Sequence, residues 1–257
     1  MRSKLKPTLF VIFATQRTGS TWLVRMLDNH PSIASYAEML EGTGSDWDRQ
    51  DVEFFEPYYA RHCKHHYPFS RARWLLRYLN GPYSPQRGTE AIGIKLMYNQ
   101  LWHNPAVLIY MVRHRVRVIH LVRANRLDIL LSKETAEARQ QYHAWQDEAV
   151  ETPTVTLDPD NVISRLRILE LGVRIARCIL TLLPIKHCEV SYEQLMANPD
   201  LVSDILAFLK VRTQLASPTL VSGFRKLNTQ SKPDLIENYA EIERALKGTR
   251  FEHFLTE

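Results

Sequence analysis

A short polar turn near the start of the chain carries side chains suited to holding an anion. The turn spans residues 15–21 and reads TQRTGST. Arginine makes paired, charge-assisted hydrogen bonds to phosphate-like groups, and hydroxyl groups add further donors. Glycine lets the backbone bend and come close to a ligand. The candidate anion-binding residues are therefore Arg17, Thr18, Gly19, Ser20 and Thr21.

The elements on either side of this turn would position it as an anion cradle. Residues 9–14 form an uninterrupted apolar run, which is typical of a strand buried on both faces of a parallel sheet. Leu23, Met26 and Leu27 follow at helical spacing, so a helix is expected to begin as the turn ends. The N–H groups at a helix start lack partners within the helix, and together with the helix dipole they favour an anion.

The turn differs in its cation from the loop that binds nucleoside triphosphates. That loop reads GxxxxGK[ST], and its lysine reaches the phosphates. No lysine occurs between Leu9 and Asp28, so Arg17 supplies the charge. The pattern T-x-R-T-G-S-T resembles instead the 5′-phosphosulfate loop of sulfotransferases that use 3′-phosphoadenosine-5′-phosphosulfate (PAPS). The bacterial carbohydrate branch, with nodulation-factor and trehalose sulfotransferases, is the most similar; an ordinary strand–turn–helix is the alternative.

Two carboxylates follow the second predicted strand, residues 32–36. Ligands of open α/β sheets bind outside the carboxyl ends of the strands, so these carboxylates lie at the edge that faces the cradle. In the sulfotransferases that the chain resembles, an acidic residue after this strand can serve as the general base. Glu38 matches that position, and Glu41 is the competing candidate. A solvated loop carboxylate is the alternative interpretation of Glu38.

A lysine lies in the apolar strand predicted over residues 92–98. Gly93, Lys95 and Gln100 resemble the family pattern G-x-K-x-x-x-x-Q. The resemblance implies that Lys95 faces the sulfuryl group or the acceptor, as a catalytic residue beside Glu38 and Arg17. A lysine at the sheet edge that extends to solvent is the alternative.

A second anion site is expected where the strand over residues 116–122 ends. Sulfotransferases place an arginine there, and a serine about two helical turns later, against the 3′-phosphate of PAPS. Arg123 and Ser132 match these roles, although the spacing is one residue longer than in the cytosolic branch. Arginine grips phosphate with two parallel hydrogen bonds. A surface salt bridge is the alternative role for Arg123.

Further cofactor contacts come from the two ends of the chain. Trp22, directly after the cradle, completes the predicted cofactor-binding set at the N-terminal side. In the family, a basic segment near the C-terminus closes over the 3′-phosphate. The candidates here, with a solvated charge run as the alternative, are Arg225, Lys226 and Lys232.

Composition limits the classes of protein that fit. The 257 residues carry a formal net charge of +5, which suits an anionic ligand, a nucleic acid or a membrane surface. Three cysteines without a CxxC pair favour a reducing compartment. No run reaches the roughly 20 apolar residues that span a bilayer, and the basic N-terminus leads into the cradle rather than to a cleavage site. We therefore expect a cytoplasmic protein with no membrane span.

Residues 42–88 form an aromatic-rich and histidine-rich insertion, which is expected to cover the active site and bind the acceptor. Aromatic rings suit the apolar faces of sugars, but they are also ordinary core residues. The cluster of His62, Cys63, His65 and His66 looks metal-like. Neighbouring residues on one element point apart, and no second ligand pair at zinc spacing follows, so no metal site is predicted.

The later part of the chain is predicted mainly from its apolar spacing. A strand and loop are expected over residues 152–159, a helix over 160–183 and one final helix over 235–246. His120 lies inside a strand and is expected to be a core histidine with satisfied hydrogen bonds. The segment that begins with Tyr192 and Glu193 resembles the family's Y-E-D-L turn, and both side chains are interpreted as structural.

These observations predict one P-loop-like α/β domain over residues 1–257, with a central, mainly parallel sheet and helices on both faces. The resemblance implies sulfuryl transfer from PAPS to an acceptor hydroxyl group, most simply on a carbohydrate or glycoconjugate. The reaction would be a metal-free in-line displacement with a carboxylate base, leaving 3′,5′-ADP. Lipid, phenol and peptide tyrosine acceptors stay open, as does a homo-oligomer.

Two other classes of protein remain as alternatives. A P-loop-type nucleotide kinase would depend on Mg²⁺ and a cradle lysine, and that lysine is missing. A non-enzymatic, basic nucleic-acid-binding protein would gather its cations on one face. Here the 33 basic residues are spread along the chain and nearly balanced by 28 acidic ones. We therefore expect no nucleic acid partner.

Overall fold

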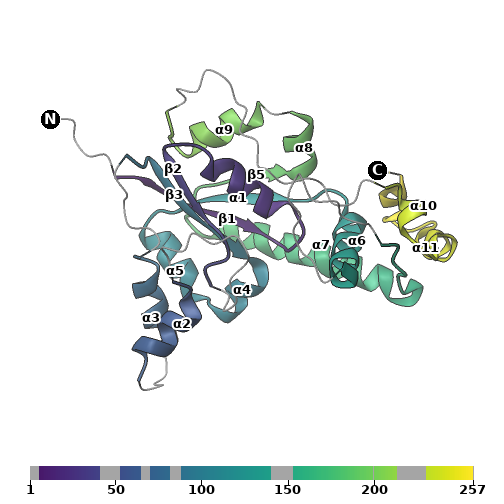
Figure 1. Ribbon diagram of the computed structural model, residues 1–257, viewed down its shortest axis with the longest axis horizontal. Coiled ribbons are helices and arrows are strands. Elements are labelled where there is room, and N and C mark those ends of the chain that lie inside the picture. The colour runs from purple at the N-terminus through teal and green to yellow at the C-terminus, as the bar shows by residue number, and fades with distance from the viewer. Residues whose placement is uncertain are drawn as a thin grey trace.

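Five parallel strands form the sheet at the centre of the molecule (Figure 1). The computed structural model describes residues 6–40, 53–64, 70–81, 88–139, 153–198, 200–212 and 230–256. The strand order is β2-β3-β1-β4-β5. Their bounds are Thr8–Ala14 for β1, Ile33–Tyr36 for β2, Ala91–Met97 for β3, Arg117–Val122 for β4 and His187–Ser191 for β5. The predicted parallel sheet is confirmed.

The first strand lies in the middle of this order. Thr8 of β1 pairs with Ala91 of β3, and Phe10 pairs with Arg117 of β4. The chain therefore builds β2 and β3 on one side of β1 before it crosses to build β4 and β5 on the other. Ligands of open α/β sheets bind where the strand order reverses in this way. The turn that follows β1 occupies that position.

Helices cover both faces of the sheet, as the sequence predicts (Figure 1). Alternating side chains of β1 enter different cores: Phe10 and Ile12 face one side, and Val11 and Phe13 face the other. The first core is completed by α1 (Ser20–Asp28), α8 (Tyr192–Ala197) and α9 (Leu201–Phe208). The second is completed by α2 (Phe55–His62), α3 (Ser70–Tyr78), α4 (Tyr98–His103), α5 (Ala106–Arg113) and the end of α7 (Pro159–Leu182).

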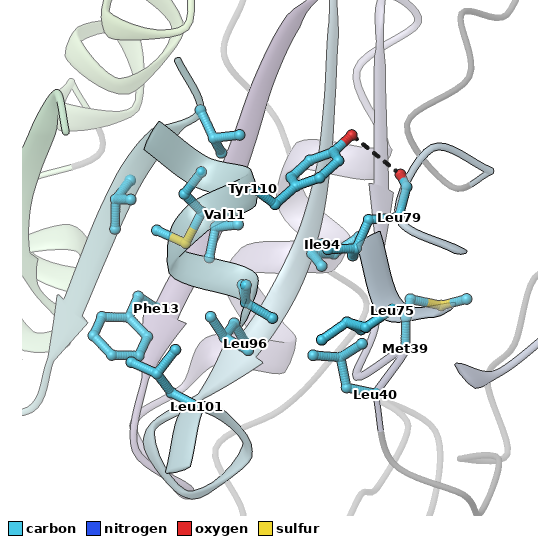
Figure 2. Close-up of a cluster of buried hydrophobic side chains, with 14 of the residues drawn as sticks. Val11, Phe13, Met39, Leu40, Leu75, Leu79, Ile94, Leu96, Leu101 and Tyr110 are labelled. Carbon is cyan, nitrogen blue, oxygen red and sulfur yellow. Dashed lines mark hydrogen bonds between the residues drawn. The ribbon is translucent and has the colours of Figure 1, made fainter. Parts of the chain in front are cut away.

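The second core is shown in Figure 2, where Phe13 and Leu96 of the sheet lie near Leu101 of α4. Tyr110 of α5 donates a hydrogen bond of 3.3 Å to the carbonyl of Leu79. Within the aromatic-rich insertion, Phe55 and Tyr78 are buried in this same core. These two rings are therefore core residues, while a role of the insertion over the acceptor site stays a prediction.

A third core joins α6 (Arg126–Arg139) and the start of α7 to the last part of the chain. The single final helix predicted over residues 235–246 is wrong: α10 (Lys232–Leu235) ends first, and α11 (Tyr239–Leu246) then begins. Between them Ile236 forms an isolated bridge to Val155, and the described part of the predicted strand and loop, residues 153–159, contributes no strand to the main sheet. Asn238 also bonds the backbone of Leu157 through both side-chain atoms. Val155 donates 2.9 Å to the carbonyl of Leu235 and accepts from the N–H of Glu237 at 3.0 Å, so it satisfies backbone groups that a continuous helix would have paired internally.

His120 is buried on the sheet face opposite α1, because its neighbours Ile119 and Leu121 face α1. Its Nδ1 lies 3.0 Å from a carboxylate oxygen of Glu189, and its Nε2 lies 2.5 Å from the Tyr98 hydroxyl. Arg177 binds the same Glu189 with two hydrogen bonds and lowers its pKa. An ionised Glu189 only accepts, so Nδ1–H donates and Nε2 accepts from the tyrosine. Both ring nitrogens are therefore bonded, as expected for a core histidine.

This network predicts a stability that falls in mild acid. Burial lowers the pKa of His120 from its ordinary value of 6.5, although Glu189 acts in the opposite direction. As the pH falls below 6.5, His120 binds a proton more readily in the unfolded chain than in the folded protein. The free energy of unfolding therefore decreases as pH falls. One such group contributes at most about 1.4 kcal/mol per pH unit. Urea unfolding of the wild type and of His120→Gln, between about pH 7.5 and 5.5, measures the difference.

The comparison removes one titrating group, and Arg177, the main cause of the lowered pKa of Glu189, is present in both proteins. We expect His120→Gln to be less stable at the upper pH and to show the flatter pH dependence. Equal slopes in the two proteins would mean that His120 is protonated as readily in the folded state as in the unfolded chain.

Candidate active site

The turn after β1 adopts the backbone geometry of an anion cradle. Arg17 and Gly19 both have left-handed backbone angles, with φ of 62° and 82°. Gly19 is the N-cap of α1, and its carbonyl accepts the first helical hydrogen bond, from Leu23 at 3.1 Å. The next N–H groups, of residues 20–22, have no carbonyl within the helix to bond. They lie at the positive end of the helix dipole, where an anion is stabilised.

Gly19 is required by its surroundings as well as by its backbone angle. A Cβ atom at this position would lie 2.3 Å from Cδ2 of Tyr192, closer than any two carbon atoms can pack. Tyr192 also packs edge-on against Trp22, with ring centroids 6.1 Å apart. Tyr192 thus supports the back of the cradle, in agreement with its interpretation as structural. Sequence spacing gave no signal for this contact between α8 and the turn.

The hydroxyl groups of the turn have different surroundings. Thr18 is buried and donates 2.8 Å to the carbonyl of Thr15, which closes the turn internally. Ser20 is also buried. Thr21 accepts a hydrogen bond of 3.0 Å from the ammonium group of Lys95, which leaves its own hydroxyl proton available for donation. Thr18 therefore shapes the cradle through its side chain, and Thr21 links the cradle to β3.

Lys95 and Glu38 form an ion pair beside the cradle. The Lys95 Nζ lies 2.6 Å from Oε1 of Glu38, and the two side chains are 5% and 23% exposed. Gln100 of α4 donates 3.2 Å to the other oxygen, Oε2. Its own carbonyl oxygen accepts from the backbone of Met97 at 3.1 Å, which fixes the amide orientation. Glu38 is therefore held at the sheet edge rather than solvated as a loop carboxylate, and Lys95 does not extend to solvent.

Arg123 joins the cradle to the end of β4. One of its terminal nitrogens donates 3.1 Å to the carbonyl of Arg17. Its guanidinium lies over the ring of Tyr192, with 5.4 Å from Cζ to the centroid, and its Nε lies 3.9 Å from Glu193. Glu193 also accepts from the backbone N–H of Ala124 at 2.9 Å. Arg123 is thus oriented from several sides and is not a surface ion pair.

Ser132 of α6 is brought to the same place. Its hydroxyl oxygen accepts a hydrogen bond of 3.0 Å from Nε of Arg17. The arginine of the cradle and the serine of the second predicted anion site are therefore in direct contact, although they lie far apart in the sequence. The longer spacing between Arg123 and Ser132 does not separate them from the cradle.

A cavity of about 300 Å³ opens beside Arg123, between α6, α10 and the 3₁₀ helix η1 (Glu252–Leu255). Lys232, one of the three basic candidates of the C-terminal segment, also lines it. The other two, Arg225 and Lys226, lie outside the described residues, as does Glu41. Sequence reasoning did not identify Asp128, which lines this cavity too. Its position in the first turn of α6 is ordinary for an acidic residue and gives no sign of a binding role.

Neither a metal-ligating cluster nor a membrane-crossing helix is found in the part of the chain that the structure describes. No group of three or more His, Cys, Asp or Glu residues there could hold a metal ion. His62 and Cys63 are described, whereas His65 and His66 lie outside these residues. The described helices include none with the length and apolar character needed to cross a bilayer.

Known proteins resemble this chain over most of its length. Nodulation protein H of Rhizobium tropici is 24% identical over 250 residues, which cover 96% of this chain and 93% of that protein. A sulfotransferase from Alicyclobacillus acidocaldarius aligns structurally over 98% of this chain and 96% of that chain, with 15% identity and a TM-score of 0.48. The sulfotransferase domain from the curacin biosynthetic pathway covers 82% of this chain and 76% of its own, with 15% identity and a TM-score of 0.42.

The family model gives the most direct assignment. It describes the sulfotransferase family and matches residues 7–214, which include β1, the cradle, Lys95 and Arg123. A match of this extent favours sulfuryl transfer over a nucleotide kinase or a nucleic-acid-binding protein. The chain belongs to the sulfotransferase family, and it is a sulfotransferase enzyme.

Proposed function

We propose that this sulfotransferase moves the sulfuryl group of PAPS to a hydroxyl group of a carbohydrate or glycoconjugate. The observation that carries the proposal is the chain of contacts from Gln100 through Glu38 and Lys95 to Thr21. This chain links a carboxylate that can take a proton to a loop that can hold an anion. General-base transfer needs both groups within hydrogen-bond reach of one reacting centre.

The two anion sites support PAPS as the donor. PAPS carries negative charge at two places, the 5′-phosphosulfate and the 3′-phosphate. The free N–H groups at the start of α1, with Arg17 and Thr21, fit the first. Arg123 and Ser132 fit the second, and the 3.0 Å contact between Arg17 and Ser132 brings the two sites together. Lys232 lines the cavity, and of the three basic C-terminal candidates it is the one among the described residues; it can contribute to the second site.

The residues of this chain would contribute to transfer mainly by position and charge. Glu38 accepts the proton of the acceptor hydroxyl as that oxygen forms its bond to sulfur. The bond between sulfur and the bridging oxygen of the donor breaks, and 3′,5′-ADP and a sulfate ester result. Negative charge grows on the bridging oxygen, where Arg17, Lys95 and the N–H groups of the cradle can stabilise it. In this scheme the cradle provides the positive charge, so no metal ion is required.

The carbohydrate acceptor rests on similarity. The sequence resembles the bacterial carbohydrate branch of the family, and Nodulation protein H is related along nearly the whole chain. A carboxylate base suits an alcohol, whose proton is held too tightly to leave without help. Transfer of labelled sulfate from PAPS to a panel of oligosaccharides, lipids, phenols and tyrosine peptides tests the acceptor class separately from the donor.

Calorimetric titration with 3′,5′-ADP, 5′-ADP and ATP, each with and without Mg²⁺, tests the donor. We expect 3′,5′-ADP to bind most tightly, with no dependence on Mg²⁺, because Arg123 and Ser132 recognise the 3′-phosphate. Equal binding of 3′,5′-ADP and 5′-ADP would remove the 3′-phosphate site from the proposal. Preference for ATP with Mg²⁺ would contradict PAPS as the donor. Arg123→Ala is the matched variant, and it should lose the preference for 3′,5′-ADP.

A further inference from the structure

The cavity beside Arg123 contains an unexpected negative charge. Its polar wall combines two cations, Arg123 and Lys232, with the carboxylate of Asp128, and its apolar wall includes Leu131, Leu235 and Leu255. A site for a phosphate group gains nothing from a carboxylate of the same charge. The presence of Asp128 among the cations therefore needs an explanation.

The carboxylate of Asp128 bridges the two cations. Its Oδ2 accepts a hydrogen bond of 2.9 Å from Nη2 of Arg123, and its Oδ1 lies 3.7 Å from Nζ of Lys232. The side chains of Arg123 and Lys232 are only 11% and 12% exposed, and that of Asp128 is 23% exposed. Charges so poorly hydrated interact strongly, so a second anion at this place competes directly with the carboxylate.

We propose that Asp128 is an internal competitor of the nucleotide 3′-phosphate. Its carboxylate pairs with Arg123 and Lys232 until the phosphate replaces it. The inference rests on the proposed function, since it takes the 3′-phosphate to bind at Arg123. The expected consequence is weaker binding and faster release of 3′,5′-ADP, the product that must leave after each turnover. Asp128 is thus a residue that tunes nucleotide affinity.

Neighbouring residues already perform the two structural roles that Asp128 could have, capping α6 and orienting Arg123. The cap of α6 is provided by Asn125, whose side-chain oxygen accepts the N–H of Asp128 at 3.2 Å. Arg123 is oriented without Asp128, through the carbonyl of Arg17 and the ring of Tyr192. Removing the charge of Asp128 should therefore leave Arg123 in place and make its guanidinium more available to a phosphate.

The test is calorimetric titration of the wild-type protein and of Asp128→Asn with 3′,5′-ADP and with 5′-AMP. We expect Asp128→Asn to bind 3′,5′-ADP about tenfold more tightly, with slower dissociation in a stopped-flow experiment. Binding of 5′-AMP, which lacks the 3′-phosphate, should not change. Glu134→Gln is the matched control, because it removes one carboxylate from the same helix at an ion pair with Arg165, away from the cavity wall.

Each other outcome rejects the inference in a recognisable way. Weaker binding of 3′,5′-ADP by Asp128→Asn would make Asp128 a positioning residue for Arg123. Equal gains for 5′-AMP, or for Glu134→Gln, would indicate a general effect of net charge. Unchanged binding would show that the carboxylate does not compete, with the proposed function intact. A wild type that binds no 3′,5′-ADP would reject the proposed function together with the inference. Asp128→Ala repeats the test if the asparagine variant folds poorly.

Discussion

Glu38→Gln is expected to lower the turnover number by about 10²–10⁴-fold, because a neutral amide cannot take the proton of the acceptor hydroxyl. The amide has nearly the same shape as the carboxylate, and its oxygen can still accept from Gln100, which now bonds Oε2 at 3.2 Å. Affinity for 3′,5′-ADP should therefore be unchanged. The measurement is the rate of sulfate transfer from PAPS beside the calorimetric titration of the same preparation.

The chain offers a matched control for this variant. Glu137 and Lys133, both on α6, form an ion pair of the same two residue types as Glu38 and Lys95. The side chains of Glu137 and Lys133 are each 50% exposed. Glu137→Gln should keep full turnover. If Glu38→Gln also kept full turnover, Glu38 would not be the base, and Glu41 or Lys95 would be the next candidate.

Lys95→Met should lower the turnover number by about 10²–10³-fold, the loss typical when one group that stabilises transition-state charge is removed. The methionine fills nearly the same buried volume but cannot donate to Thr21 or pair with Glu38. An arginine at the same position is not expected to rescue activity. The Lys95 side chain is only 5% exposed, and the wider guanidinium group does not fit the buried space that it fills. Lys133→Met, at the exposed pair, should be neutral.

A double-mutant cycle separates the two roles that Lys95 can have. If Lys95 acts only by holding Glu38, the double variant Lys95→Met/Glu38→Gln should be no slower than Glu38→Gln alone. If Lys95 also stabilises charge on the sulfuryl group or its bridging oxygen, the two losses should multiply. We expect the losses to multiply in large part, because Nζ contacts the cradle at Thr21 as well as Glu38. Complete non-additivity would reduce Lys95 to a positioning residue.

The parts of the site that could be predicted from sequence are local. An apolar run followed by a glycine-containing polar turn specifies the strand, the cradle and the start of α1 without help from the rest of the chain. Glu38 and Arg123 follow strands directly, so the parallel sheet carries both to the cradle edge. Lys95 is conspicuous because a charged residue interrupts an apolar strand. The resemblance to sulfotransferases implies roles for positions that their residue types and placement already single out.

The parts that could not be predicted depend on long-range packing. Nothing local to Tyr192 indicates that its ring fills the space left by Gly19, and nothing local to Arg17 indicates its hydrogen bond to Ser132. The break between α10 and α11 is invisible to periodicity, because residues on both sides have helical spacing. It arises from the pairing of Ile236 with Val155, which satisfies the backbone there.

The central place of β1 also has a consequence for how the protein is made. The ribosome delivers β1 first, with both of its edges unpaired, and its neighbours β3 and β4 emerge only after residues 91 and 117 have been added. Contacts between such distant parts of a chain form slowly, because a long loop must close before they are gained. The cradle, Lys95 and Arg123 lie on these three strands and their ends. The binding site therefore cannot exist in the nascent chain until β4 is complete, and until then the apolar strand β1 has at least one open edge that needs protection from other chains.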